Sequence, residues 1–144
     1  MTTKVILTAA AMNSLKEIAK TENYTMWYGN VEQNNDAIRI TKIIVPEQKN
    51  NQVSSTISTG ASAKIMMENL EENFNCFGVS RTTGGTSTSA TEEQMFATIS
   101  AAHSISDAAD QAAVTCIDDK NGNLRFSVWE DGVRTGDNIP WEAE

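Results

Sequence analysis

Apolar residues recur at helical spacing near the start of the chain. Met12, Leu15 and Ile18 would share one face of a helix running from Thr8 to about Lys20. Thr8 suits the N-cap position, because its hydroxyl can accept a hydrogen bond from a free backbone N–H of the first turn. A short apolar run at residues 5–7 precedes this helix and predicts a strand.

Further along, β-rich runs alternate with helical patterns. The β-branched and aromatic residues predict strands at residues 24–29, 37–45, 76–80, 113–117 and 124–129. Helical spacing predicts helices at about residues 61–73 and 91–103. These elements indicate one α+β domain at residues 1–130, with a mixed β-sheet and about three helices. Residues 131–144 are mostly polar and form a C-terminal tail, for which the pattern favours neither docking nor extension into solvent.

The composition argues against several functions. The 144 residues include 11 Lys and Arg against 19 Asp and Glu, which gives a net charge of −8. An acidic chain repels the phosphates of nucleic acids and of anionic membranes. The chain has one His, so it cannot supply the pair of histidines on which many zinc hydrolases rely. We therefore expect no nucleic-acid partner, no membrane partner, no metal and no cofactor.

Features that govern cellular location favour the cytoplasm. The N-terminal sequence lacks the long apolar run and the small-residue cleavage site of a signal peptide. No apolar run approaches the roughly 18 residues that cross a bilayer. Cys76 and Cys116 lie in apolar surroundings, so we expect buried free thiols, which are typical of a reducing compartment.

Several spacings along the chain match those of one enzyme family. Glu22 stands seven residues before the glycine that ends a predicted strand, and the next predicted strand runs into Pro46. Ser89 stands three residues before Glu92. This frame resembles the JAB/MPN family, also called JAMM, whose best-known members are zinc isopeptidases that remove ubiquitin-like modifiers. The resemblance implies a JAB/MPN-like, cytidine-deaminase-like fold, and the small size is similar to that of stand-alone prokaryotic or phage members.

The positions that hold zinc in this family carry other residues here. The family motif has two histidines and an aspartate, and the alignment places Val79, Arg81 and Glu92 there. Valine and arginine offer no lone pair to a metal, so the resemblance implies a degenerate metal site made of Glu22, Val79, Arg81, Ser89 and Glu92. We predict that Arg81 replaces the cation by pairing with Glu22 and Glu92. The alternative is that Arg81 lies at an exposed strand end while Val79 closes the cavity.

A segment rich in Ser and Thr follows Arg81. It includes Thr82, Thr83, Gly84, Gly85 and Thr86, which we interpret as a binding loop. A phosphate site is not favoured there, because no Lys follows as in a P-loop and the next predicted helix begins with two glutamates.

These features predict a catalytically inactive member of that family, acting as a protein-binding or scaffold module. The resemblance implies protein partners, including a ubiquitin-like tail or another JAB/MPN subunit, and leaves a homo-oligomer open. A phage accessory, structural or anti-defence protein fits this interpretation, with the host cytoplasm or the virion as its location. The alternative function is a hydrolase or isopeptidase with a non-standard or relocated active site, using a Ser or Thr of residues 80–91 as the nucleophile.

Overall fold

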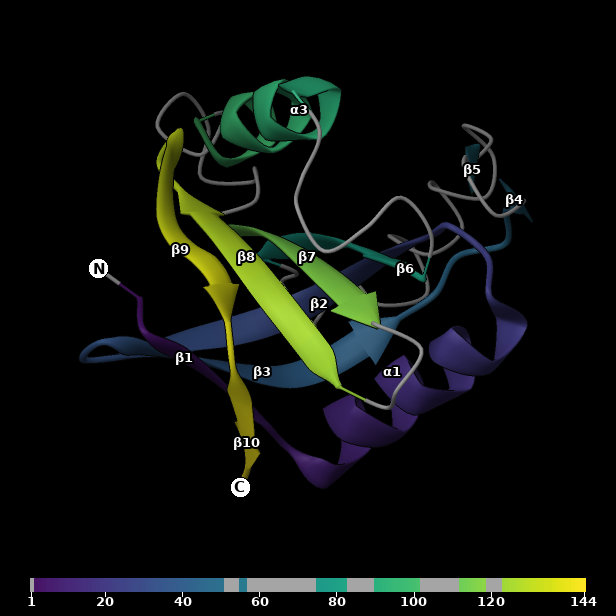
Figure 1. Ribbon diagram of the computed structural model, residues 1–144, viewed down its shortest axis with the longest axis horizontal. Coiled ribbons are helices and arrows are strands. Elements are labelled where there is room, and N and C mark those ends of the chain that lie inside the picture. The colour runs from purple at the N-terminus through teal and green to yellow at the C-terminus, as the bar shows by residue number, and fades with distance from the viewer. Residues whose placement is uncertain (1, 51–54, 57–74, 83–89, 102–111, 119–122) are drawn as a thin grey trace.

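The computed structural model describes residues 2–50, 55–56, 75–82, 90–101, 112–118 and 123–144. The largest part of them belongs to one eight-stranded mixed sheet (Figure 1). In spatial order its strands are β10 (Trp141–Ala143), β1 (Lys4–Leu7), β3 (Ala37–Ile44), β2 (Thr25–Asn34), β6 (Cys76–Arg81), β7 (Ala112–Asp118), β8 (Leu124–Glu130) and β9 (Val133–Ile139). The described helices are α1 (Ala9–Thr21) and α3 (Ala90–Ala101), and a small second sheet pairs β4 (Lys49–Asn50) with β5 (Ser55–Thr56).

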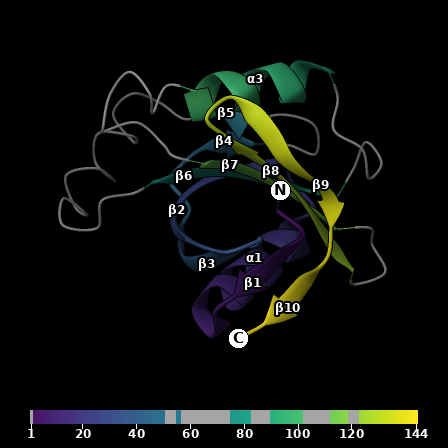
Figure 2. The same cartoon turned by 90° about the vertical axis from the view of Figure 1, so that its left-hand side faces the viewer.

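The two outermost strands of the large sheet are neighbours in the chain. β9 pairs antiparallel with β8, and β10, which follows after Pro140, pairs parallel with β1. The chain therefore crosses from one end of the sheet to the other and nearly closes it into a barrel, with a seam at Pro140 (Figure 2). The Thr2 backbone N–H adds a hydrogen bond across this seam to the Thr135 carbonyl, at 2.8 Å.

This architecture corrects the expected fold. The α+β, JAB/MPN-like (cytidine-deaminase-like) arrangement of a sheet flanked by about three helices is wrong, because the described residues form a mostly β structure with two helices and a nearly closed sheet. The further helix expected at residues 61–73 lies outside the described residues. The physical reason for the difference lies in residues 131–144, where β9 and β10 bring the two ends of the sheet together.

The hairpin of β8 and β9 is made by a tight turn. Asp131 and Gly132 have φ angles of 50° and 83°, and two successive positive φ angles are typical of the type I′ turn that joins antiparallel strands. An Asp-Gly pair is therefore the sequence signal for this hairpin. β9 looks like a polar tail in the sequence because most of its side chains are exposed, so its place in the sheet depends on backbone pairing.

The elements with strong local signals are confirmed. The helix expected from Thr8 to Lys20 is α1, and the Ala11 N–H donates to the Thr8 hydroxyl at 3.2 Å, as predicted for the N-cap. β2 and β3 form the expected hairpin, with Asn35 at a φ of 58° in the turn. α3, β6, β7 and β8 match the other expected elements to within about two residues at each end.

The barrel interior is apolar and filled. Trp27 and Phe126 are fully buried there, and Leu15 and Ile18 of α1 pack against the same core. A Cβ atom on Gly78 would lie 2.1 Å from carbons of the Trp27 indole, so the ring occupies space that only a glycine leaves free. The interior is thus a packed core of the kind found in small barrels.

The opposite face of the sheet carries a second core beneath α3, which we call the outer layer. Phe77 and Val79 of β6 and Trp129 of β8 pack there with Phe96 of α3. The Phe96 and Trp129 rings stack with their centroids 4.9 Å apart. α1 and α3 lie on opposite sides of the sheet (Figure 2), so the two faces of β6 belong to different cores.

Two amide side chains extend the pairing of β2. Gln48 accepts a hydrogen bond from the Met26 N–H at 2.9 Å and donates to the Met26 carbonyl at 2.8 Å. Asn75 makes the same two bonds with Val31, at 2.8 Å and 3.0 Å. Gln48 lies beyond the end of β3, and Asn75 lies just before the start of β6. The backbone of β2 therefore stays hydrogen-bonded where its pairing with these two strands stops.

Candidate functional site

Arg81 and Glu92 form a buried ion pair between β6 and α3, which we call the α3 ion pair. The Arg81 Nε donates to Glu92 Oε2 at 3.2 Å, and Nη2 donates to Glu92 Oε1 at 3.1 Å. Arg81 is 6% exposed and Glu92 is 9% exposed. The guanidinium fork therefore meets both carboxylate oxygens, which is a strong geometry for such a pair. The predicted contact between these side chains is confirmed, and the alternative of an exposed Arg81 is wrong.

The α3 ion pair fixes the first turn of α3 on the sheet. Alternation along β6 turns Arg81 to the same face as Val79, and Glu92 lies in the first turn of the helix above it. Glu93, the next residue, accepts a hydrogen bond from Arg134 of β9 at 2.5 Å. Both acidic groups also complement the positive end of the helix dipole. The start of α3 is thus tied to two strands, once by a buried ion pair with β6 and once by an exposed ion pair with β9.

Tyr24 lies beside the α3 ion pair, just before β2. The pKa of its phenol is raised to about 12, mainly by burial and also by the Glu92 carboxylate, while the Arg81 guanidinium acts in the opposite direction. The phenol therefore stays protonated at neutral pH and can donate a hydrogen bond, but it is a poor base or nucleophile. Tyr24, Arg81 and Glu92 together form the candidate site.

Glu22 does not join this site. It is the C-cap of α1, with a φ of 54°, and its N–H donates to the Ala19 carbonyl at 3.2 Å. Its side chain is exposed, and within the described part of the chain it makes no ion pair. The prediction that Glu22 pairs with Arg81 is wrong, because α1 ends at the surface, where water hydrates the carboxylate.

The other predicted site residues have separate environments. Val79 is fully buried in the outer layer. Thr82 is half-buried, and its hydroxyl oxygen has no hydrogen-bond partner among the described residues. Ser89 lies outside the described residues. The same holds for the remaining residues of the expected binding loop, which are Thr83, Gly84, Gly85 and Thr86. Their roles stay predictions.

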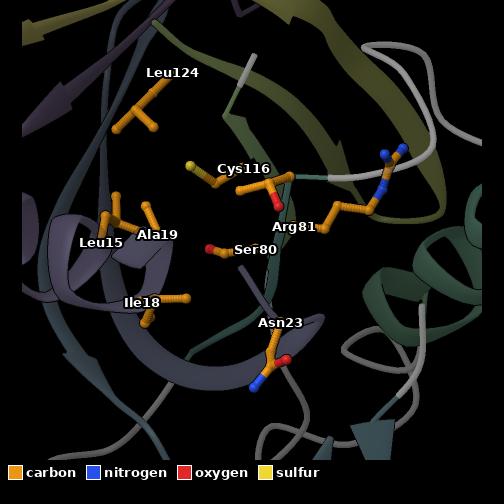
Figure 3. Close-up of a pocket in the computed structure, with 9 residues that line it drawn as sticks. Leu15, Ile18, Ala19, Asn23, Ser80, Arg81, Cys116 and Leu124 are labelled. Atoms are coloured by element: carbon orange, nitrogen blue, oxygen red, sulfur yellow. The ribbon is translucent and has the colours of Figure 1, made fainter. Parts of the chain in front are cut away.

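Ser80, next to Arg81, points to the other face of the sheet. Figure 3 shows its hydroxyl and the Cys116 thiol on the side of α1, whereas Arg81 extends away toward α3. The Ser80 oxygen accepts a hydrogen bond from Trp27 Nε1 at 3.0 Å. The pocket beside these side chains has space for about one water molecule. It is too small for a substrate, and Ser80 orients the Trp27 indole.

Within the ranges that the structure describes, no three potential metal ligands come together. Cys76 and Cys116 are buried free thiols in the barrel interior, as predicted. No helix in these ranges has both the length and the apolar character needed to traverse a bilayer.

No protein-family model matches the chain, and a search of curated proteins gives no match either. The resemblance to the JAB/MPN family stays a prediction. Function is therefore inferred from the geometry of the described residues.

A second polar group, which the sequence patterns did not single out, lies at the seam. Arg125 of β8 donates from Nε to Asn138 Oδ1 at 3.1 Å and from Nη2 to the Asn138 carbonyl. Asn138 has a φ of 53°, a left-handed conformation that is uncommon outside glycine. The sequence signal for this group is the Asp-Gly turn, because the β8–β9 hairpin brings residue 138 next to the start of β8.

Proposed function

We propose that the chain is a non-catalytic module that binds another protein. The observation that carries this proposal is the buried two-point contact of the α3 ion pair. A catalytic or metal-binding carboxylate must present its oxygens to a substrate, a proton or a metal. Both oxygens of Glu92 instead accept hydrogen bonds from one guanidinium. This supports a structural role for the site, which is to seat α3 on the sheet.

Four side chains with nucleophilic groups, those of Ser80, Cys76, Cys116 and Tyr24, support the same proposal. Ser80 accepts a hydrogen bond from an indole, and Cys76 and Cys116 are enclosed in the barrel interior. The phenol of Tyr24 keeps its proton at neutral pH, because burial raises its pKa to about 12. Each of these groups is either packed away from solvent or in its unreactive protonation state.

The surface of the sheet favours a protein as the partner. β9 and β10 are its outermost strands, and the large sheet pairs each of them on one side; Thr2 occupies part of the outer edge of β9 through its hydrogen bond to Thr135. Exposed strand edges bind extended segments of other proteins through backbone hydrogen bonds. Val133 of β9 is 63% exposed and adds apolar surface beside one of these edges.

Partner capture followed by intact mass spectrometry tests this proposal. The purified chain captures proteins from a lysate of its native source, and each captured protein is then incubated with the chain and weighed. We expect a partner that binds with a defined stoichiometry and keeps its mass. A time-dependent change of mass that Glu92→Gln abolishes would contradict the proposal.

A paired replacement separates a structural role of the site from a functional one. The double variant Arg81→Met with Glu92→Leu keeps the buried volume and removes both charges. We expect this variant to fold and to bind the captured partner with unchanged affinity. Loss of binding by a folded double variant would show that the partner needs the charges themselves.

A further inference from the structure

An open cleft lies at the seam of the barrel. β8 begins at Leu124, but its pairing with β9 begins at Phe126, opposite Ile139. Beyond that point the chain leaves β8 and continues as β10 beside β1 (Figure 1). The cleft between them has a volume of about 380 Å³ and is lined by Asn123, Leu124, Arg125, Pro140 and Trp141.

The guanidinium of Arg125 is held in a fixed orientation at this cleft. Asn138 accepts hydrogen bonds from both its Nε and its Nη2. In the described ranges no protein group accepts a bond from Nη1, so its N–H groups are left for a ligand. A cation that is oriented before binding loses little conformational entropy when a ligand arrives.

Arg125 also differs from the other arginines in its charge environment. Arg39, Arg81 and Arg134 each pair with at least one carboxylate. Within the described part of the chain, no carboxylate pairs with Arg125. The chain carries a net charge of −8, so a cation without a carboxylate at an open cleft favours an anionic ligand.

The edge of β10 offers backbone groups beside this cation. The Pro140 carbonyl accepts a hydrogen bond from β1 at 3.0 Å, and the Glu144 N–H donates to β1 at 3.0 Å. Backbone groups of a strand alternate in direction, so the N–H and C=O groups of Trp141 and Ala143 point away from β1. β10 ends the sheet, and no described strand pairs with this outer edge.

We propose that the cleft binds the C-terminal end of an extended segment of a partner protein. The segment pairs antiparallel with the outer edge of β10, and its terminal carboxylate accepts hydrogen bonds from Arg125. This inference rests on the proposed function and specifies the part of the partner that is bound.

Two features favour a chain end over an internal acidic residue. The cleft closes beyond Pro140, because Ile139 pairs directly with Phe126, so an added strand must stop there. In the antiparallel orientation the end that reaches Arg125 is the carboxyl end. In the parallel orientation it would be a positively charged amino end, which the guanidinium repels. The half-buried Trp141 supplies apolar surface for the last side chains of the segment.

Fluorescence anisotropy with three peptide pools tests this inference. The first pool contains N-terminally labelled peptides of about six residues, built from Val, Ile and Thr, with a free C-terminal carboxylate. The second pool is identical but ends in an amide, and the third ends in an amide and carries an internal Asp. We expect the first pool to bind, and amidation or Arg125→Gln each to weaken binding by roughly tenfold or more.

Arg134→Gln is the matched control, because it removes the same charge from an exposed position on β9 outside the cleft. It should bind the first pool as tightly as the parent chain does. The inference is overturned if the amidated pool binds as tightly as the first pool, or if Arg125→Gln binds the first pool as tightly as the parent chain does. Tighter binding of the third pool than of the first, or no binding of any pool, would overturn it as well. A captured partner protein that still binds in any of these cases leaves the proposed function intact.

Hydrogen exchange provides a readout of the strand pairing. The amide protons of Trp141 and Ala143 should exchange more slowly when the first pool is bound, because the peptide accepts hydrogen bonds from them. Binding without slower exchange at these two amides would overturn the antiparallel pairing with β10.

Discussion

The barrel interior and the outer layer are stabilised in different ways. The interior is filled by apolar side chains, with the Trp27 indole seated directly against Gly78. The outer layer combines the stacked rings of Phe96 and Trp129 with the α3 ion pair. The barrel interior is therefore stabilised by the packing of apolar side chains alone, and the outer layer by apolar packing together with a buried pair of charges.

The difference teaches what each core specifies. Apolar packing is non-directional, so the interior mainly fixes how tightly the sheet curls around its contents. A two-point ion pair permits one relative orientation of its partners, so the outer layer fixes where α3 begins on the sheet. A substitution in the barrel interior should lower the free energy of unfolding by changing the packed volume. A substitution in the α3 ion pair should lower it by leaving a buried charge unpaired.

Removing one partner of the α3 ion pair should have the largest effect. Glu92→Leu leaves the Arg81 guanidinium buried without a counter-charge, so we expect the free energy of unfolding to fall by about 4 kcal/mol. Urea denaturation measures this loss. Arg81→Met combined with Glu92→Leu should recover most of it. A double variant as unstable as the single one would show that packing, and not charge, seats α3.

Added volume in the interior should have the next largest effect. The new methyl group of Gly78→Ala would overlap the Trp27 indole, and we expect a loss of about 3 kcal/mol in urea denaturation. The matched control is Gly136→Ala, where the nearest atoms, the flexible end of Ile139 and the Thr2 carbonyl oxygen, both lie 3.0 Å from the added Cβ. Its expected loss is about 1 kcal/mol. Similar losses at the two positions would contradict the tight seating of the indole.

Tyr24 should make stability fall at alkaline pH. The pKa of its phenol is raised from 10.0 to about 12 in the folded chain. Between these values the unfolded state loses the proton first, so the free energy of unfolding decreases as the pH rises from 10 to 12. We expect a loss of roughly 1 kcal/mol, since water reaches part of the ring. In a denaturation series over this range, Tyr24→Phe should decline less steeply; an equal decline would argue against burial of the phenol beside the α3 ion pair.

Glu22→Gly should have the smallest effect, and it should stabilise the chain. Glycine adopts the left-handed φ of this C-cap at little cost, so we expect a gain of about 0.5 kcal/mol in thermal or urea denaturation. Glu17→Gly, inside α1, is the control and should lose about 1 kcal/mol. Destabilisation by Glu22→Gly would mean that its carboxylate does contribute to the outer layer.

Elements with local signals could be predicted from the sequence. The periodicity of α1 and its Thr8 cap depend on residues within a few positions of one another, and the structure confirms both. The contact between Arg81 and Glu92 follows from the spacing that resembles the JAB/MPN metal motif, because that alignment places a cation and a carboxylate at one site.

Closure of the sheet could not be predicted in the same way. It depends on pairing between β1 and β10, which lie at opposite ends of the described chain, and on strands whose exposed side chains give no apolar pattern. The spacing of Glu22 before a strand likewise does not indicate whether its side chain faces Arg81 or the solvent. Local patterns identified most of the elements, whereas the curl of the sheet and the surface position of Glu22 required tertiary contacts.

The seam at Pro140 has a consequence for the order of folding. β1 finds its first neighbour in β3, whose paired residues lie 33 positions further along the chain, but its other neighbour, β10, is synthesised after every other described strand. Until β10 emerges, one edge of β1 has no partner and the core is open on that side. Contacts between segments so far apart form slowly, because a long loop must close before they are made. We expect closure of the barrel to be the last and slowest step, so a nascent chain halted before Pro140 would keep its hairpins while exposing its core to chaperones.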